Sequence, residues 1–177
     1  MIPAEGSSDP FWSDPSNEAP RMARIQAIVE RQQDIDKIIF YVGKSNNDNF
    51  VAYRWESEKG IIDNFWISTQ NVAEERRDTL NLAEQMVYGT TLRITPGGWI
   101  VKMNAEQLKS KVMNLVMDDK DNAKLVGPVN GKMCILSHAY VQMSQGLLPS
   151  VDWIRLTGHE VATGNAQSEV LDANERT

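Results

Sequence analysis

Short segments rich in β-branched and aromatic residues recur along most of this chain, with turn-forming residues between them. Residues 37–42 and 49–55 are two such segments, and the intervening 43–48 is rich in Gly, Asn, Asp and Ser. These residue types tolerate the backbone angles of tight turns. Asn130-Gly131 is the strongest two-residue hairpin signal in the chain. Because strands joined by short hairpins pair antiparallel, the sequence predicts a mainly antiparallel β fold.

The remaining elements follow from the same patterns. Further strand segments are expected at 61–68, 90–95, 99–104, 109–117, 124–129, 133–143 and 151–157, with a short last one at 167–171, and the fold is expected to have roughly nine strands. Two amphipathic helices are predicted. One lies within 19–36, with Pro20 in its first turn and apolar residues at three- and four-residue spacings, and the other spans 72–87 and ends at Gly89. The predicted class is α+β, mainly antiparallel β, as a sandwich or partly closed barrel.

The chain divides into four regions by composition. Residues 1–18 read as an extended acidic arm, 19–36 as the N-terminal helix, 37–171 as the β-rich domain and 172–177 as a tail. The net charge of −6 is concentrated at the ends: residues 1–20 carry −4 and residues 160–177 carry −3. The intervening 21–159 holds 17 basic and 16 acidic residues. A dense basic cluster, which nucleic acids and anionic membranes require, is absent from the sequence.

Several classes of protein are excluded by simple counts. A single cysteine, Cys134, rules out an intramolecular disulfide framework and a multi-cysteine zinc site. No apolar run is long enough to span a membrane, and no secretion leader is recognisable. These features favour a reducing compartment, with the cytoplasm slightly preferred.

The familiar catalytic templates do not occur. The sequence has no Gly-x-Ser-x-Gly elbow, no phosphate-binding Gly-x-x-x-x-Gly-Lys-Ser/Thr loop and no His-Glu-x-x-His. The acidic run 118–122 lacks the glycine and the closing glutamate of a calcium loop and is expected to be a solvated turn. We therefore predict no catalytic residue, no metal and no cofactor, and regard a non-enzymatic role as the better expectation.

Two histidines and the cysteine were weighed as possible reactive groups. His138 follows Ser137 in a predicted strand, where neighbours point to opposite faces, so these two should not form a nucleophile–base pair. Cys134 should share a face with His138 but lie roughly 13 Å away at strand rise, which indicates a buried structural thiol. His159 follows Gly158 at a strand end beside Glu160, where it could act as a base or a lone metal ligand.

The acidic arm carries two large aromatic residues. Phe11 and Trp12 are bracketed by Asp9 and Asp14 within two Ser-Asp-Pro triplets. Exposed tryptophan is uncommon in a free tail. The aromatic pair therefore either folds back onto its own domain or inserts into a protein partner or a second copy of the chain. On the second reading Asp9, Phe11, Trp12 and Asp14 are the partner-binding residues.

A small-ligand site is the alternative. Five tryptophans in 177 residues could stack on a flat or apolar ligand, although most such residues simply fill a core. A site between sheet faces or at a barrel mouth would draw on aromatic, amide and basic side chains of the strands and their turns. The candidate contacts are Lys44, Asn46, Tyr53, Trp66, Arg155 and His159.

Several pieces of the chain, in this order, resemble an uncharacterised family catalogued as domain of unknown function 4833. They are the hairpin pieces 40–46 and 49–53, Tyr88-Gly89, the run 148–158, and Thr163-Gly164 with Glu169 after it. The resemblance covers about residues 38–171 and leaves the arm and the first helix outside. It implies no activity and no catalytic residues. Bacterial members of the family are often exported, which stands against the missing leader.

Two functions remain as expectations. The first is a non-enzymatic β-rich interaction module that docks into a protein assembly through its N-terminal arm, with a protein partner or a second copy of the chain. The second is a small-ligand-binding or hydrolytic protein with its site between the sheet faces or at a barrel mouth.

Overall fold

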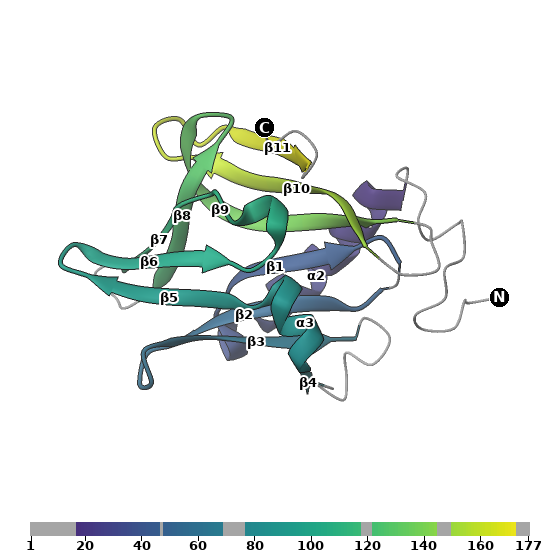
Figure 1. Ribbon diagram of the computed structural model, residues 1–177, viewed down its shortest axis with the longest axis horizontal. Coiled ribbons are helices and arrows are strands. Elements are labelled where there is room, and N and C mark those ends of the chain that lie inside the picture. Colours follow the sequence, from purple (N-terminus) through teal and green to yellow (C-terminus); the bar gives the residue numbers. More distant parts are fainter. Residues whose placement is uncertain (1–16, 47, 69–76, 118–121, 145–149, 173–177) are drawn as a thin grey trace.

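The computed structural model describes residues 17–46, 48–68, 77–117, 122–144 and 150–172 (Figure 1). Within them the chain forms two α-helices, α2 (Glu18–Asp36) and α3 (Leu82–Tyr88), and a short 3-10 helix, Glu106–Leu108. The same residues form eleven strands. These are β1 (Ile38–Lys44), β2 (Phe50–Glu56), β3 (Ile61–Ile67), β4 (Arg77–Thr79), β5 (Thr90–Thr95), β6 (Gly98–Met103), β7 (Met113–Met117), β8 (Ala123–Val129), β9 (Lys132–Met143), β10 (Val151–Glu160) and β11 (Ala166–Asp172).

All eleven strands belong to one sheet that curls over on itself. The order is β4-β3-β2-β1-β9-β8-β7-β6-β5, and β10 pairs with the other edge of β9 and with β11. Strand β9 connects the two halves, because its first residues pair with β8 and its later residues pair with β1. The β1–β4 half and the β5–β8 half thus form two layers, and Trp55 of β2 meets Trp99 of β6 at 5.6 Å between ring centroids. The predicted class, mainly antiparallel α+β with a partly closed barrel, is confirmed.

One pairing departs from the antiparallel expectation. Strands β1 and β9 are parallel, with Tyr41 opposite His138 and Lys44 opposite Val141. The paired residues are 97 positions apart in sequence, so no hairpin fixes the relative direction of the two strands. The local turn signals that predicted antiparallel neighbours could not specify this long-range pair.

The main core lies between the two layers. It is built from the inward-facing residues of both halves, including Phe40 and Val51 from one and Val101, Met113 and Leu125 from the other, all less than 2% exposed. The alternation of these residues along each strand is what a sheet with one buried face requires.

A second core lies under α2, on the opposite face of the β1–β3 layer. Met22, Ile25, Ile28 and Val29 of the helix pack on a sheet surface that includes Phe50 and Phe65. Figure 1 shows α2 running along the far side of this layer. Gly43 permits the close approach, since a Cβ there would lie 2.5 Å from the Met22 sulfur. The apolar spacing that predicted this helix is therefore the surface that it buries.

The second predicted helix, 72–87, is wrong over residues 77–81. The chain forms β4 at Arg77–Thr79, paired with β3, and α3 begins only at Leu82. Asn81 caps the helix by accepting from the Glu84 amide, and the Glu84 carboxylate accepts from the Asn81 amide. This reciprocal capping box fixes the start of the helix locally. Residues 69–76 and residues 118–121 of the predicted acidic turn lie outside the described residues.

In the part of the chain that the structure describes, neither helix has the length and apolar character needed to cross a membrane.

Candidate functional site

Three of the predicted ligand contacts converge on the inner side of the β1–β3 layer. Lys44 continues the inward-facing series of Phe40 and Val42 and is only 7% exposed. Its Nζ lies 4.9 Å from the centroid of the Trp66 ring on β3, a cation–π arrangement. Tyr53 of β2 is fully buried nearby in the same core as Trp66.

Tyr88, at the end of α3, completes this group. The Tyr53 hydroxyl donates to the Tyr88 carbonyl oxygen at 2.6 Å, and the Tyr88 ring meets Trp66 edge-on at 5.2 Å. Burial, and in second place the neighbouring Tyr88, raises the pKa of Tyr53. Burial, and then the Glu84 charge, raises the pKa of Tyr88. Both phenols therefore remain neutral and serve as fixed hydrogen-bonding groups.

Two buried polar atoms in this region have no hydrogen-bond partner. They are Trp66 Nε1 and Asn46 Oδ1, the latter two residues beyond Lys44. Such atoms are costly to bury without a partner. We call Lys44, Tyr53, Trp66 and Tyr88 the aromatic–lysine cluster, and Asn46 lies outside it in the β1–β2 connection. The cluster offers a cation, an aromatic face and an indole donor, a set that suits an anionic or acceptor-bearing group.

The other two predicted contacts lie elsewhere. Arg155 on β10 is register partner to Tyr140 and faces the α2 side of the sheet, where it pairs with Glu18 at 2.7 Å. His159 is exposed and lies opposite Ile135, at the end of β9 away from Lys44. The prediction grouped six residues by chemical type, and the sheet register separates Arg155 and His159 from the rest.

Ser137 and His138, which the alternation of a regular strand predicts to point to opposite faces, are hydrogen-bonded to each other. Ser137 Oγ and His138 Nδ1 lie 2.9 Å apart. The reason is an irregularity in the β9–β10 ladder: Thr157 pairs with His138 and Gly158 with Leu136, so Ser137 is an extra residue on β9. A bulge of this kind breaks strict alternation and re-aims the side chains on either side of it.

The same bulge explains why the predicted placement of Cys134 relative to His138 is wrong. Cys134 is a buried free thiol on the inner face, whereas His138 stacks on Tyr41, on the face under α2. The two side chains therefore do not share a face, contrary to prediction. Burial raises the pKa of Cys134, and the Glu160 charge adds to the effect. The expected structural thiol is thus buried and poorly ionised.

His138 is held as a neutral imidazole. The rings of His138 and Tyr41 stack with centroids 5.1 Å apart, and the Tyr41 hydroxyl hydrogen-bonds to Ser137. Burial, and secondarily the charge of His159, lowers the pKa of His138 to about 4. A nucleophile–base pair normally has a third group that orients the base. The hydrogen bonds that link Tyr41, Ser137 and His138 satisfy the polar groups of these partly buried side chains, and among the described residues no carboxylate is hydrogen-bonded to His138.

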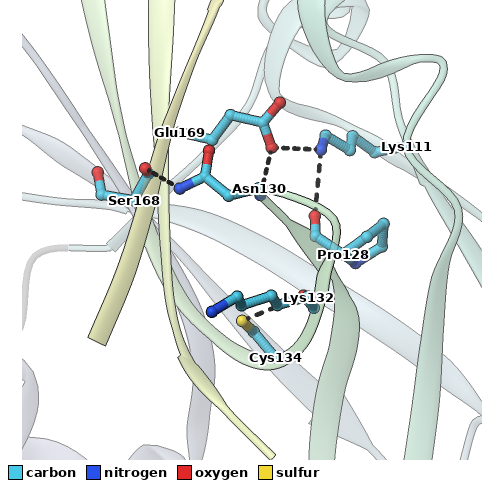
Figure 2. A network of polar contacts seen from close by, with 7 residues as sticks. All are labelled: Lys111, Pro128, Asn130, Lys132, Cys134, Ser168 and Glu169. Carbon is cyan, nitrogen blue, oxygen red and sulfur yellow. Dashed lines mark hydrogen bonds and ion pairs between the residues drawn. The ribbon is translucent and has the colours of Figure 1, made fainter. Parts of the chain in front are cut away.

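A polar network between β11 and the turn that joins β8 to β9 was not predicted from the sequence. Figure 2 shows Glu169 of β11 accepting from Lys111 at 2.6 Å and from the Asn130 amide at 2.9 Å. Lys111 also donates to the Pro128 carbonyl, and the Asn130 side chain donates to the Ser168 carbonyl. Asn130 and Gly131 both have positive φ, as the predicted Asn-Gly hairpin turn requires. The network fastens this turn to β11, which is a structural role.

Asp9, Phe11, Trp12 and Asp14 lie outside the described residues. Within the described ranges, no three His, Cys, Asp or Glu residues gather as a metal site would require.

The fold defined above is a curled antiparallel sheet with one helix-covered face. The model of the family called Domain of unknown function (DUF4833) matches residues 40–170. The chain belongs to this family, as the resemblance had indicated. No curated protein and no solved structure matches the chain.

Proposed function

We propose that the protein is a non-enzymatic interaction module that docks into a protein assembly through its N-terminal arm. The observation that supports this proposal is the anchoring of the segment that follows the arm. Glu18, the first residue of α2, pairs with Arg155 of β10, and Arg21 is buried at 3% exposure and donates to the Lys44 carbonyl at 2.6 Å. The arm therefore starts from a fixed point on the sheet.

A fixed starting point suits a docking peptide. Anchoring limits the conformations that the preceding residues must give up on binding, and aromatic side chains entering a pocket supply most of the affinity of short peptides. Phe11 and Trp12 lie only six or seven residues before Glu18. The family match begins at residue 40, so the arm and α2 lie outside the matched domain.

Deleting residues 1–16 tests the proposal. The truncated chain should keep its circular dichroism spectrum and melting temperature and should lose a higher-order species in light scattering, or a partner in pull-downs from the native source. The variant with Phe11→Ala and Trp12→Ala should behave like the deletion, and Ile2→Ala serves as the matched control. Unchanged assembly size and unchanged partners in the deletion would rule out the arm as the docking element.

A second candidate function rests on the aromatic–lysine cluster. The buried Lys44 over Trp66, with Trp66 Nε1 unbonded, favours a small anionic ligand between the sheet layers. A panel of small carboxylates and phosphates should quench tryptophan fluorescence and raise the melting temperature if such a ligand exists. The variant Lys44→Met should abolish the shift. A panel without any effect on either readout counts against this function.

A further inference from the structure

The β5–β8 layer has an outer face that no element of the second core covers. Along β6, β7 and β8 the inward residues, such as Val101, Leu115 and Leu125, are buried. Their neighbours in sequence therefore point outward. The outward side chains used below are Arg93, Ile100, Lys102, Val116, Lys124 and Val126, and we call them the open face.

The open face is apolar and basic at once. Ile100 and Val126 are half-buried and Val116 is 47% exposed, while Arg93, Lys102 and Lys124 are all exposed. The strands β5 to β8 contain no Asp or Glu at all. A solvated face of an antiparallel sheet is ordinarily polar and of mixed charge.

The register makes these side chains one continuous surface. Arg93 pairs with Ile100, Ile100 with Asn114, and Asn114 with Val126, which places them in a row across four strands. In a neighbouring row Val116 pairs with Lys124. Neighbouring strands lie about 4.8 Å apart, so such a row spans roughly 15 Å.

We propose that the open face receives the acidic arm, residues 1–16, of a second copy of the chain. This inference rests on the proposed function, because it names the surface into which the arm docks. The arm holds three carboxylates, Glu5, Asp9 and Asp14, with no Lys or Arg, and its aromatic pair lies between the last two. The charge and the apolar content of the open face are complementary to both features.

The order of the layers favours a second copy of the chain, rather than the same chain, as the source of the docking arm. Glu18, the first residue of α2, lies on the outer, helix-covered side of the sheet, and the open face points the opposite way, beyond the other layer. Reaching it within one chain would require the arm to pass round the edge of the sheet. Two copies related by a two-fold axis can exchange arms reciprocally, and the arm of each copy then covers the open face of the other.

A charge-swap experiment tests the inference. One variant reverses the face (Arg93→Glu, Lys102→Glu, Lys124→Glu) and another reverses the arm (Glu5→Lys, Asp9→Lys, Asp14→Lys). Each alone should show at least ~10-fold weaker self-association in sedimentation velocity, because like charges then oppose docking. Mixing the two should restore a dimer, since both arm–face pairs are again complementary. The parent dimer should weaken as salt is added.

The control and the outcomes separate the two proposals. Reversing three exposed cations outside the open face (Arg31→Glu, Lys59→Glu, Lys109→Glu) makes the same change in net charge and should leave the dimer intact. A mixture that stays monomeric, or a parent chain that is monomeric at all concentrations, overturns the inference. If the arm deletion abolishes assembly while the face variant does not, the arm still docks but elsewhere, so only the inference fails. Should the triple face variant not fold, Lys102→Glu alone and the salt dependence carry the test.

Discussion

At the scale of single residues, one inserted position decides how β9 presents its polar groups. Ser137 is the extra residue of the bulge, and its presence turns His138 toward Tyr41 and away from Cys134. The rule of alternation that the sequence analysis used is correct for a regular strand. A bulge cannot be read from residue types here, because it depends on the partner strand, β10.

The neutral state of His138 has a measurable consequence for stability. Its folded pKa of about 4 is depressed from the ordinary 6.5, so between these values the unfolded state binds a proton that the folded state does not. Stability should therefore fall as pH drops from about 7 toward 4. In urea unfolding, the free energy of unfolding of the His138→Gln variant should fall by up to ~3 kcal/mol less than that of the parent protein across this pH window. An identical pH dependence in both proteins would contradict this environment for His138.

Gly158 sits beside the bulge and has no room for a side chain. A Cβ there would lie 2.7 Å from the Ile135 carbonyl oxygen and 3.1 Å from the Cys134 Cβ. Because a backbone atom cannot move aside as a flexible side chain can, Gly158→Ala should destabilise the fold by ~1–3 kcal/mol. Gly97→Ala is the matched control, since a Cβ at Gly97 meets nothing within 4 Å. Equal melting temperatures for the two variants would count against the described packing.

At the scale of elements, polar contacts join strands and turns whose proximity the hydrophobic pattern does not predict. The turn between β8 and β9 was predicted from Asn130-Gly131 alone, and the structure confirms it. Its attachment to β11 through Glu169 and Lys111 joins residues 58 apart in sequence. No local spacing signals such a pair.

The Glu169 network should stabilise the fold in a pH-dependent way. Burial tends to raise the pKa of Glu169, but the bonds from Lys111 and the Asn130 amide, with the Lys111 charge, outweigh it and lower the pKa overall. This contribution is present above the ordinary glutamate pKa and is lost as pH falls through the lower folded value. Glu169→Gln should cost ~1–2 kcal/mol at pH 7 and much less near pH 3, measured by chemical unfolding. Glu58→Gln, in the exposed β2–β3 turn, should cost nothing at either pH.

At the scale of the whole molecule, the family domain depends on an element outside the family match. The β1–β3 layer is buried on both faces, by the β5–β8 layer on one side and by α2 on the other. Residues 40–170 alone would expose Phe50 and Phe65, which are nearly completely buried in the full chain. An exposed apolar patch of this kind promotes aggregation.

Two truncations should separate the arm from the helix. Deleting residues 1–16 should leave the melting temperature unchanged, while deleting 1–36 should lower it by more than ~10 °C or prevent folding, because four buried helix side chains and Arg21 are lost. Thermal unfolding followed by circular dichroism checks both. A stable, monomeric product of the longer deletion would show that α2 is dispensable to the fold.

The sequence alone determined most of the elements. Strand segments, the Asn-Gly turn and the buried side of the first helix follow from alternation, turn chemistry and apolar spacing, which act over a few residues. The start of α3 was also available locally, in the capping pair Asn81 and Glu84, although the apolar pattern upstream obscured it. The candidate contacts Lys44, Tyr53 and Trp66 were proposed from residue type, and their convergence was not foreseeable.

Only the tertiary structure decided which distant segments meet. Four features depend on contacts between residues far apart in sequence. They are the parallel pairing of β1 with β9, the bulge at Ser137, the contact of Tyr88 with Trp66, and the division of the sheet into a helix-covered face and an open face. Local propensity carries no information about such pairs, because their stability comes from burying surface that becomes shared only when the chain closes. The acidic arm was evident from composition, but a surface that could receive it became visible only once the sheet had curled.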